Sequence, residues 1–213
     1  MEMTTPPTAL VNPAEHDHFT LRQRWAPMVN KYEFTVPGRD GSPDLPVCFV
    51  QQKRFKFKED IRFYADATKT VELMRIKARQ RFDPRARYDI TDPNGYKIGE
   101  IQKVFGESLL RSTYRIYDVN GAETAKVTES SMAVALIRRF VGFVPYIGGF
   151  ADFLPIPYHF VFLRGDYELG TNRRRLFKIR DTYDIDLSGD PNKSLDRRLV
   201  LAAVVGMDAL QAR

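Results

Sequence analysis

The last eighteen residues, 196–213, read DRRLVLAAVVGMDALQAR. From Leu199 to Leu210 every residue is apolar or glycine except Asp208. A helix over this stretch is about 18 Å long, whereas a bilayer core needs about 20 apolar residues. A helix that is apolar on all sides is usually buried. We therefore expect a helix over about 196–211, capped by Ser194 or Asp196, that forms the core of the fold.

Most of the remaining chain alternates apolar and polar residues, which is typical of half-buried strands. In ELMRIKARQRF, residues 72–82, Met74 and Ile76 fall on one face and basic residues on the other. The same alternation runs through RARYDITD (85–92) and TYDIDL (182–187), and RFKFKED (54–60) is predicted to point Phe55 and Phe57 inward.

An internal repeat supports this interpretation. The pattern Y-x-I-x-D-x-N-G begins at Tyr88 and again at Tyr114, with a shorter echo, YDIDLSGD, at Tyr183. Asn-Gly between alternating runs indicates a hairpin, because both residues tolerate positive φ. Repeated hairpins form a meander that must close or be covered. We therefore predict a mainly β fold, a closed antiparallel barrel with the C-terminal helix buried at its centre.

Length and charge place limits on the class of protein. The 213 residues suggest one domain, which we expect at 20–213 after a flexible Pro/Thr-rich tail over 1–19. The net charge of +6 favours anionic partners. The single cysteine, Cys48, excludes an internal disulfide, and the first residues lack the basic and apolar regions of a secretory signal. A cytoplasmic location is the expectation.

Three features in this order resemble the LURP-one-related family of the tubby C-terminal-like superfamily, which is related to phospholipid scramblases. They are FVQQKRFKFKEDIRFY from Phe49, the two Asn-Gly hairpins and the final apolar helix. The resemblance implies a barrel threaded by the C-terminal helix. Tubby domains bind phosphoinositides through paired basic residues, but a fold does not by itself carry a function.

The first candidate site is a basic strand face. If FDPR (82–85) turns the chain, basic side chains of two neighbouring strands share this face, with only Glu72 and Asp89 opposing them. Like charges across paired strands are destabilising, so the clustering indicates an anionic ligand. The alternative is a solvated outer face that acidic residues elsewhere partly neutralise. The predicted anion- or lipid-binding residues are Arg75, Lys77, Arg79, Arg81, Arg85 and Arg87.

The second candidate is an aromatic segment within 130–162, behind two arginines. Such a segment can enter a bilayer interface beside anionic headgroups. The alternative is a plug that packs on one mouth of the barrel. The predicted interface residues are Arg138, Arg139, Phe140 and Phe143.

Metal binding and catalysis find little support in the sequence. DIDLSGD, from Asp184, resembles the start of a calcium loop, but Leu195 stands where the closing glutamate is needed. Cys48 has no evident base nearby, and no P-loop, nucleophile elbow or dinucleotide motif is present. We expect no catalytic residue, metal or cofactor, and no nucleic-acid partner.

The sequence thus favours a non-enzymatic module, peripheral at the inner membrane face, that binds anionic phospholipid headgroups or another polyanion. One alternative is a protein-interaction or regulatory scaffold with an unknown protein partner. Another, suggested by the resemblance alone, is scramblase-like lipid transport, which the short terminal helix disfavours.

Overall fold

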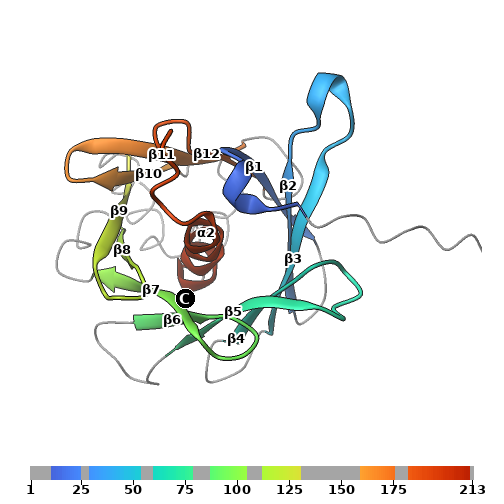
Figure 1. Cartoon of the computed structure of the whole chain (residues 1–213), viewed down its shortest axis with the longest axis horizontal. Coiled ribbons are helices and arrows are strands. Elements are labelled where there is room, and N and C mark those ends of the chain that lie inside the picture. The colour runs from blue at the N-terminus through green and yellow to red at the C-terminus, as the bar shows by residue number, and fades with distance from the viewer. Residues whose placement is uncertain are drawn as a thin grey trace, which may run out of the picture.

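The computed structural model describes residues 11–24, 29–53, 60–78, 87–104, 112–130, 159–175 and 182–211. Within them, twelve strands form one closed antiparallel barrel around helix α2, and β1 pairs with β12 to close the ring (Figure 1). The predicted fold class is confirmed. The strands are β1 His18–Arg24, β2 Val29–Val36, β3 Leu45–Lys53, β4 Asp60–Tyr64, β5 Glu72–Ala78, β6 Arg87–Thr91, β7 Lys97–Val104, β8 Thr113–Tyr117, β9 Glu123–Glu129, β10 His159–Arg164, β11 Tyr167–Arg174 and β12 Thr182–Asp186.

Helix α2 (Arg197–Gln211) lies inside this ring, where Figure 1 shows it end-on. Every described hydrophobic side chain from Leu199 to Met207 is at most 2% exposed. The backbone N–H of Arg198 donates to Asp196 Oδ1 at 2.9 Å, so Asp196 is the residue that caps the helix. The prediction that the apolar helix forms the core is confirmed.

The helix approaches the wall most closely at β7. A Cβ atom added at Gly99 would lie 2.8 Å from Leu199 Cδ2 and 2.4 Å from the Tyr117 carbonyl oxygen. Farther along the helix, a Cβ at Gly206 would lie 3.8 Å from Ile101 Cδ1. Gly99 therefore lets the first turn of α2 pack directly on the sheet, which an alanine there would prevent without a backbone shift.

The two Asn-Gly repeats form the predicted hairpins, β6–β7 and β8–β9, but the expected reason was wrong. Only the glycines, Gly95 and Gly121, have positive φ; the asparagines do not. Each turn instead depends on its aspartate. Asp118 Oδ1 accepts from the backbone N–H groups of Asn120 and Ala122, both at 2.9 Å, and Asp92 Oδ1 accepts from that of Tyr96 at 2.8 Å.

The third repeat, at Tyr183, does not return as a hairpin. Its first half is strand β12, with Tyr183, Ile185 and Leu187 buried as the alternation predicts. The chain then turns at 187–190, where the Asp190 N–H donates to the Leu187 carbonyl at 3.0 Å, and continues into α2. The shorter repeat at Tyr183 therefore lies where the chain leaves the barrel wall, at the end of β12, and continues toward the buried helix α2.

The barrel begins earlier than the predicted boundary after residue 19. A short 3₁₀ helix, η1 (Pro13–Glu15), is capped by Asn12, and β1 starts at His18. Phe19 pairs with Ile185 of β12 and is 2% exposed. The alternation of β1 thus extends the sheet into what the proline-rich composition indicated as tail.

Every second connection between the strands lies at the end of the barrel where α2 begins. These connections are the turns after β2, β4, β6, β8 and β10, and the loop after β12; the first of them contains η2 (Arg39–Gly41). Arg164, at the end of β10, donates to Ser194 Oγ at 2.8 Å, which ties one of these turns to the loop before the helix. Phe55 and Phe57, predicted to point inward, lie outside the described residues.

Candidate functional site

The described part of the predicted basic face lies on the outer wall of the barrel. Met74 and Ile76 of β5 are 4% and 1% exposed in the core, so Arg75 and Lys77 between and beyond them point outward. Strand β6 pairs with β5 and adds Arg87 to the same face, as the predicted turn required. Arg79, Arg81 and Arg85 lie outside the described residues.

Glu72 neutralises one side of this face. Its carboxylate accepts from Arg75 Nε at 2.5 Å and from Arg62 Nη1 at 3.3 Å, which brings β4 and β5 together through one acid. Arg75 also reaches the Pro93 carbonyl at 3.5 Å. These arginines remain on the surface, but they already have an anionic partner.

Glu100 of β7 is an acid that the sequence analysis did not place here. Its carboxylate, 5% exposed, accepts from Lys97 Nζ at 2.9 Å and from Arg87 Nη1 at 3.2 Å. Asp89 lies opposite Glu100 across the strand pair and opposite Lys77 on the other side, and it is 3.9 Å from Lys97 Nζ. An acidic row therefore crosses the wall between basic residues.

The strand register brings further basic residues beside Arg87. Reading across the wall from β6 to β9, the paired residues are Arg87, Gln102, Arg115 and Lys126. Arg115 is 3.3 Å from Glu123, so this row also has an acid beside it. Arg115 and Lys126 were missed because only the pairing of β7, β8 and β9 places them next to Arg87. We define the wall face by Arg62, Glu72, Arg75, Lys77, Arg87, Asp89, Lys97, Glu100, Arg115, Glu123 and Lys126, in which basic residues outnumber acidic ones.

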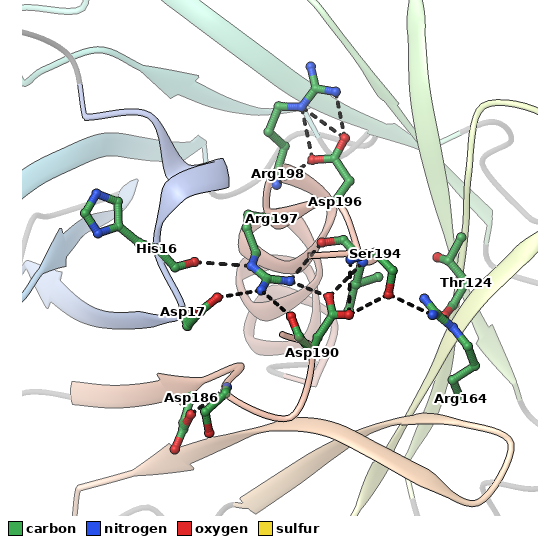
Figure 2. A network of polar contacts seen from close by, with 12 residues as sticks. His16, Asp17, Thr124, Arg164, Asp186, Asp190, Ser194, Asp196, Arg197 and Arg198 are labelled. Atoms are coloured by element: carbon green, nitrogen blue, oxygen red, sulfur yellow. Dashed lines mark hydrogen bonds and ion pairs between the residues drawn. The ribbon is translucent and has the colours of Figure 1, made fainter. Parts of the chain in front are cut away.

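A second cluster, buried at the start of α2, was also not predicted (Figure 2). The Arg197 side chain is 1% exposed and donates five hydrogen bonds. Two go to carboxylates: Nη1 to Asp190 Oδ2 at 2.7 Å and Nη2 to Asp17 Oδ1 at 2.6 Å. The others go to the carbonyls of His16, Leu195 and Asp190 at 3.2, 3.0 and 3.3 Å.

These bonds use every donor of the guanidinium, so Arg197 has no capacity left for a ligand. They join residues that lie about 180 positions apart in the chain, since Asp17 precedes β1 and Asp190 follows β12. The cluster therefore fastens the chain entering the barrel to the helix that fills it. We call Arg197, Asp17 and Asp190 the helix-entry cluster.

Asp190 is charged because its hydrogen bonds outweigh its burial. Burial alone would raise the pKa of this carboxyl, but hydrogen bonds from Ser194, Leu195 and Arg197 lower the pKa to about 2. The backbone N–H of Leu195 donates at 2.9 Å and that of Ser194 at 3.1 Å. Asp190 is thus an acceptor for the loop as well as the counter-ion of Arg197.

With this geometry in place, comparison with known proteins assigns the chain. A model of the LURP-one-related family matches residues 47–208, from strand β3 into helix α2. The chain belongs to the LURP-one-related family. The match covers both the wall face and the helix-entry cluster except for Asp17. A search of the curated proteins found no match to this LURP-one-related chain.

Other candidate sites can be placed on this LURP-one-related barrel. Asp184, at the start of the calcium-like motif, is bound by Arg175 through two hydrogen bonds of 2.6 Å. Asp186 accepts from the Ser188 N–H at 2.9 Å and lies 3.5 Å from His18. No group of three or more His, Cys, Asp and Glu residues that could hold a metal ion occurs in the described ranges.

Cys48 points into the core opposite Phe34, and burial raises the pKa of its thiol far above the ordinary value. The thiol therefore stays protonated, unlike an activated nucleophile. Arg138, Arg139, Phe140 and Phe143, the predicted membrane-interface residues, lie outside the described residues. None of the helices in the described part of the chain has the length and apolar character needed to cross a membrane.

Proposed function

We propose that this LURP-one-related barrel is a non-catalytic module that binds an anionic ligand, either phospholipid headgroups or another polyanion, on its wall face. The observation that carries the proposal is the strand register of this face. One basic row (Arg62, Arg75 and Lys97) and a second basic row (Arg87, Arg115 and Lys126) lie on either side of Asp89 and Glu100. Helix α2 occupies the barrel axis, and the outer wall is a surface that the fold offers to a ligand.

The acidic residues of the wall face reduce its potential without cancelling it. Glu72, Asp89, Glu100 and Glu123 lie close to Arg75, Lys97, Arg87 and Arg115, whereas Lys77 is exposed. Basic residues close to an anionic membrane contribute about 1 kcal/mol each. The resemblance to tubby domains, which bind phosphoinositides through basic residues, supports the same ligand class. A cytoplasmic protein, peripheral at the inner membrane face, is the location that fits this proposal.

Cosedimentation with vesicles tests the proposal. The parent chain is mixed with phosphatidylcholine vesicles and with vesicles that also contain phosphatidylserine, across a salt series. We expect binding only to the anionic vesicles, weakening as salt shortens the Debye length from about 10 Å toward 3 Å. Inorganic polyphosphate should compete for the same face.

A matched pair of variants separates the wall face from overall charge. Lys77→Ala, Arg115→Ala and Lys126→Ala together remove three charges from the wall face. Lys31→Ala, Arg39→Ala and Arg173→Ala remove three charges elsewhere. We expect the first variant to lose about 3 kcal/mol, more than a hundredfold in affinity, and the second much less. Equal losses would mean that only net charge matters, and no binding by the parent would favour a protein-interaction scaffold.

A further inference from the structure

The barrel end where α2 begins carries apolar side chains that face solvent. Among the described residues, five large hydrophobic side chains are exposed, and each lies in or beside a different turn of this end. No interior position of a described strand contributes one. We call these five residues the rim tips: Leu45 beside the β2–β3 turn, Val71 beside β4–β5, Tyr96 in β6–β7, Val119 in β8–β9 and Tyr167 beside β10–β11.

The turns do not require these side chains. In β6–β7 the fold uses the Asp92 carboxylate, the positive φ of Gly95 and only the backbone N–H of Tyr96. Tyr96 remains 74% exposed. Val119 sits at a different position of the equivalent β8–β9 turn, so the repeat does not account for both. The exposed side chains of Tyr96 and Val119 are therefore not explained by the repeated turn.

The rim around these tips is acidic, although the chain as a whole has a net charge of +6. Asp166 and Glu168 flank Tyr167, and neither takes part in an ion pair in the described structure. We define the rim as 37–45, 65–71, 92–96, 118–122, 165–168 and 187–196. Its exposed or half-buried acidic residues are Asp40, Asp44, Asp66, Asp92, Asp118, Asp166, Glu168 and Asp196, and its basic residues are Arg39, Lys69 and Lys193. Two of these acids, Asp44 and Asp196, pair with Arg22 and Arg198 beside the rim, and Asp190 is buried with Arg197.

We propose that the rim is an interaction surface for a protein partner whose contacting surface is basic and carries apolar side chains. Tyrosines in particular are enriched at protein interfaces, where the ring is buried and the hydroxyl finds a partner. Acidic residues around apolar anchors attract a basic partner and disfavour wrong ones.

The same acids argue against an anionic bilayer as the occupant of the rim, because like charges repel. The rim and the wall face adjoin at the β6–β7 turn, where Arg75 reaches the Pro93 carbonyl, but they consist of different residues and differ in charge. The inference therefore stands independently of the proposed anion binding. The barrel could hold both ligands at once, with a polyanion on its side and a protein at its end.

A peptide probe tests this inference. A fluorescein-labelled amphipathic helix of leucine and lysine, about five turns long, is titrated with the full chain and followed by fluorescence anisotropy. The same peptide with glutamate in place of lysine is the charge control. We expect the lysine peptide to bind and the glutamate peptide to bind at least about tenfold more weakly.

Substitutions test whether the lysine peptide binds at the rim. Tyr96→Ser, Val119→Ser and Tyr167→Ser together should weaken the lysine peptide about tenfold or more, since aromatic anchors dominate interfaces. Asp166→Asn with Glu168→Gln should weaken it severalfold and flatten its salt dependence. Lys77→Ala on the wall face should leave it unchanged. The single variant Tyr96→Ser changes one exposed side chain, so we expect it to fold normally and to show a smaller loss of peptide affinity.

Several results would overturn the inference. They are failure of the parent to bind the lysine peptide, equal binding of the glutamate peptide, and full binding by the triple serine variant. Loss of phosphatidylcholine vesicle binding in that variant would instead identify a bilayer as the occupant. A parent dimer in sedimentation velocity that the variant reduces to a monomer would identify a second copy of the chain.

Discussion

Arg197 and Arg75 show how burial decides what an arginine does in this barrel. Arg197 is 1% exposed, bonds two carboxylates and three carbonyls, and joins both ends of the folded chain. The Arg75 side chain is 21% exposed and shares one glutamate with Arg62. A buried pair is costly to break, whereas a surface pair contributes about 0–1 kcal/mol. The helix-entry cluster therefore serves folding, and the wall face keeps charge available for a ligand.

The largest effect should come from burying a new charge in the core, farther along α2 than the helix-entry cluster. Leu201, 1% exposed, is surrounded by the barrel, so Leu201→Asp buries a carboxylate with no partner. We expect loss of cooperative unfolding in circular dichroism, as for a chain truncated before Asp196. A folded Leu201→Asp protein with a sharp melting transition would contradict the assignment of α2 as core.

Arg197→Met should be the next most damaging change. It leaves Asp190, 3% exposed, and Asp17 without their cation, which typically costs about 3–5 kcal/mol of unfolding free energy. Urea denaturation measures this loss, and Arg75→Met on the wall face is the control, expected to cost less than about 1 kcal/mol. Similar losses for the two variants would remove the distinction between the regions.

Acid should weaken the helix-entry cluster through Asp190. Its pKa is about 2 in the folded chain, below the ordinary value of 3.8. The folded state therefore binds this proton less readily than the unfolded state, and the resulting stability is present above pH 4 and lost as the pH falls toward 2. The difference amounts to about 2 kcal/mol. In urea denaturation at pH 5 and pH 3, Asp190→Asn should show a smaller drop than the parent.

The smallest effect is expected for a substitution that tests whether the ligand contacts the part of the wall face around Glu72. Glu72→Gln removes the negative charge shared by Arg62 and Arg75, so the wall face gains one unit of net positive charge. We expect affinity for phosphatidylserine-containing vesicles to rise about fivefold, equivalent to about 1 kcal/mol. The melting temperature should shift by no more than a few degrees. Unchanged or weaker binding would indicate that the ligand does not contact Arg62 and Arg75.

The sequence predicts those features that depend on local period. Alternation correctly assigns Met74 and Ile76 to the core and Arg75 and Lys77 to the surface. The all-apolar run after Arg198 correctly indicates a buried helix. These inferences hold because side-chain direction in strands and helices follows from backbone geometry alone.

The remaining features depend on which distant segments pair. Glu100, Arg115 and Lys126 join the wall face through the register of β6 to β9, and no local pattern gives that register. Asp17 meets Arg197 only because β1 closes the barrel against β12. Two arginines stand before the apolar run, and an arginine that enters a core needs counter-ions. The sequence does not tell which of the two is buried: Arg197 is 1% exposed, whereas Arg198 is 52% exposed.

The most direct test of this account measures Arg197→Met and the triple wall variant, Lys77→Ala with Arg115→Ala and Lys126→Ala, in the same two assays. Each variant is followed by urea denaturation and by cosedimentation with phosphatidylserine-containing vesicles at a temperature where both are folded. We predict that Arg197→Met loses about 3–5 kcal/mol of stability while keeping vesicle affinity. The wall variant should lose more than about a hundredfold in affinity while keeping its stability. A wall variant that binds vesicles as the parent does, or an Arg197→Met protein as stable as the parent, would contradict the account.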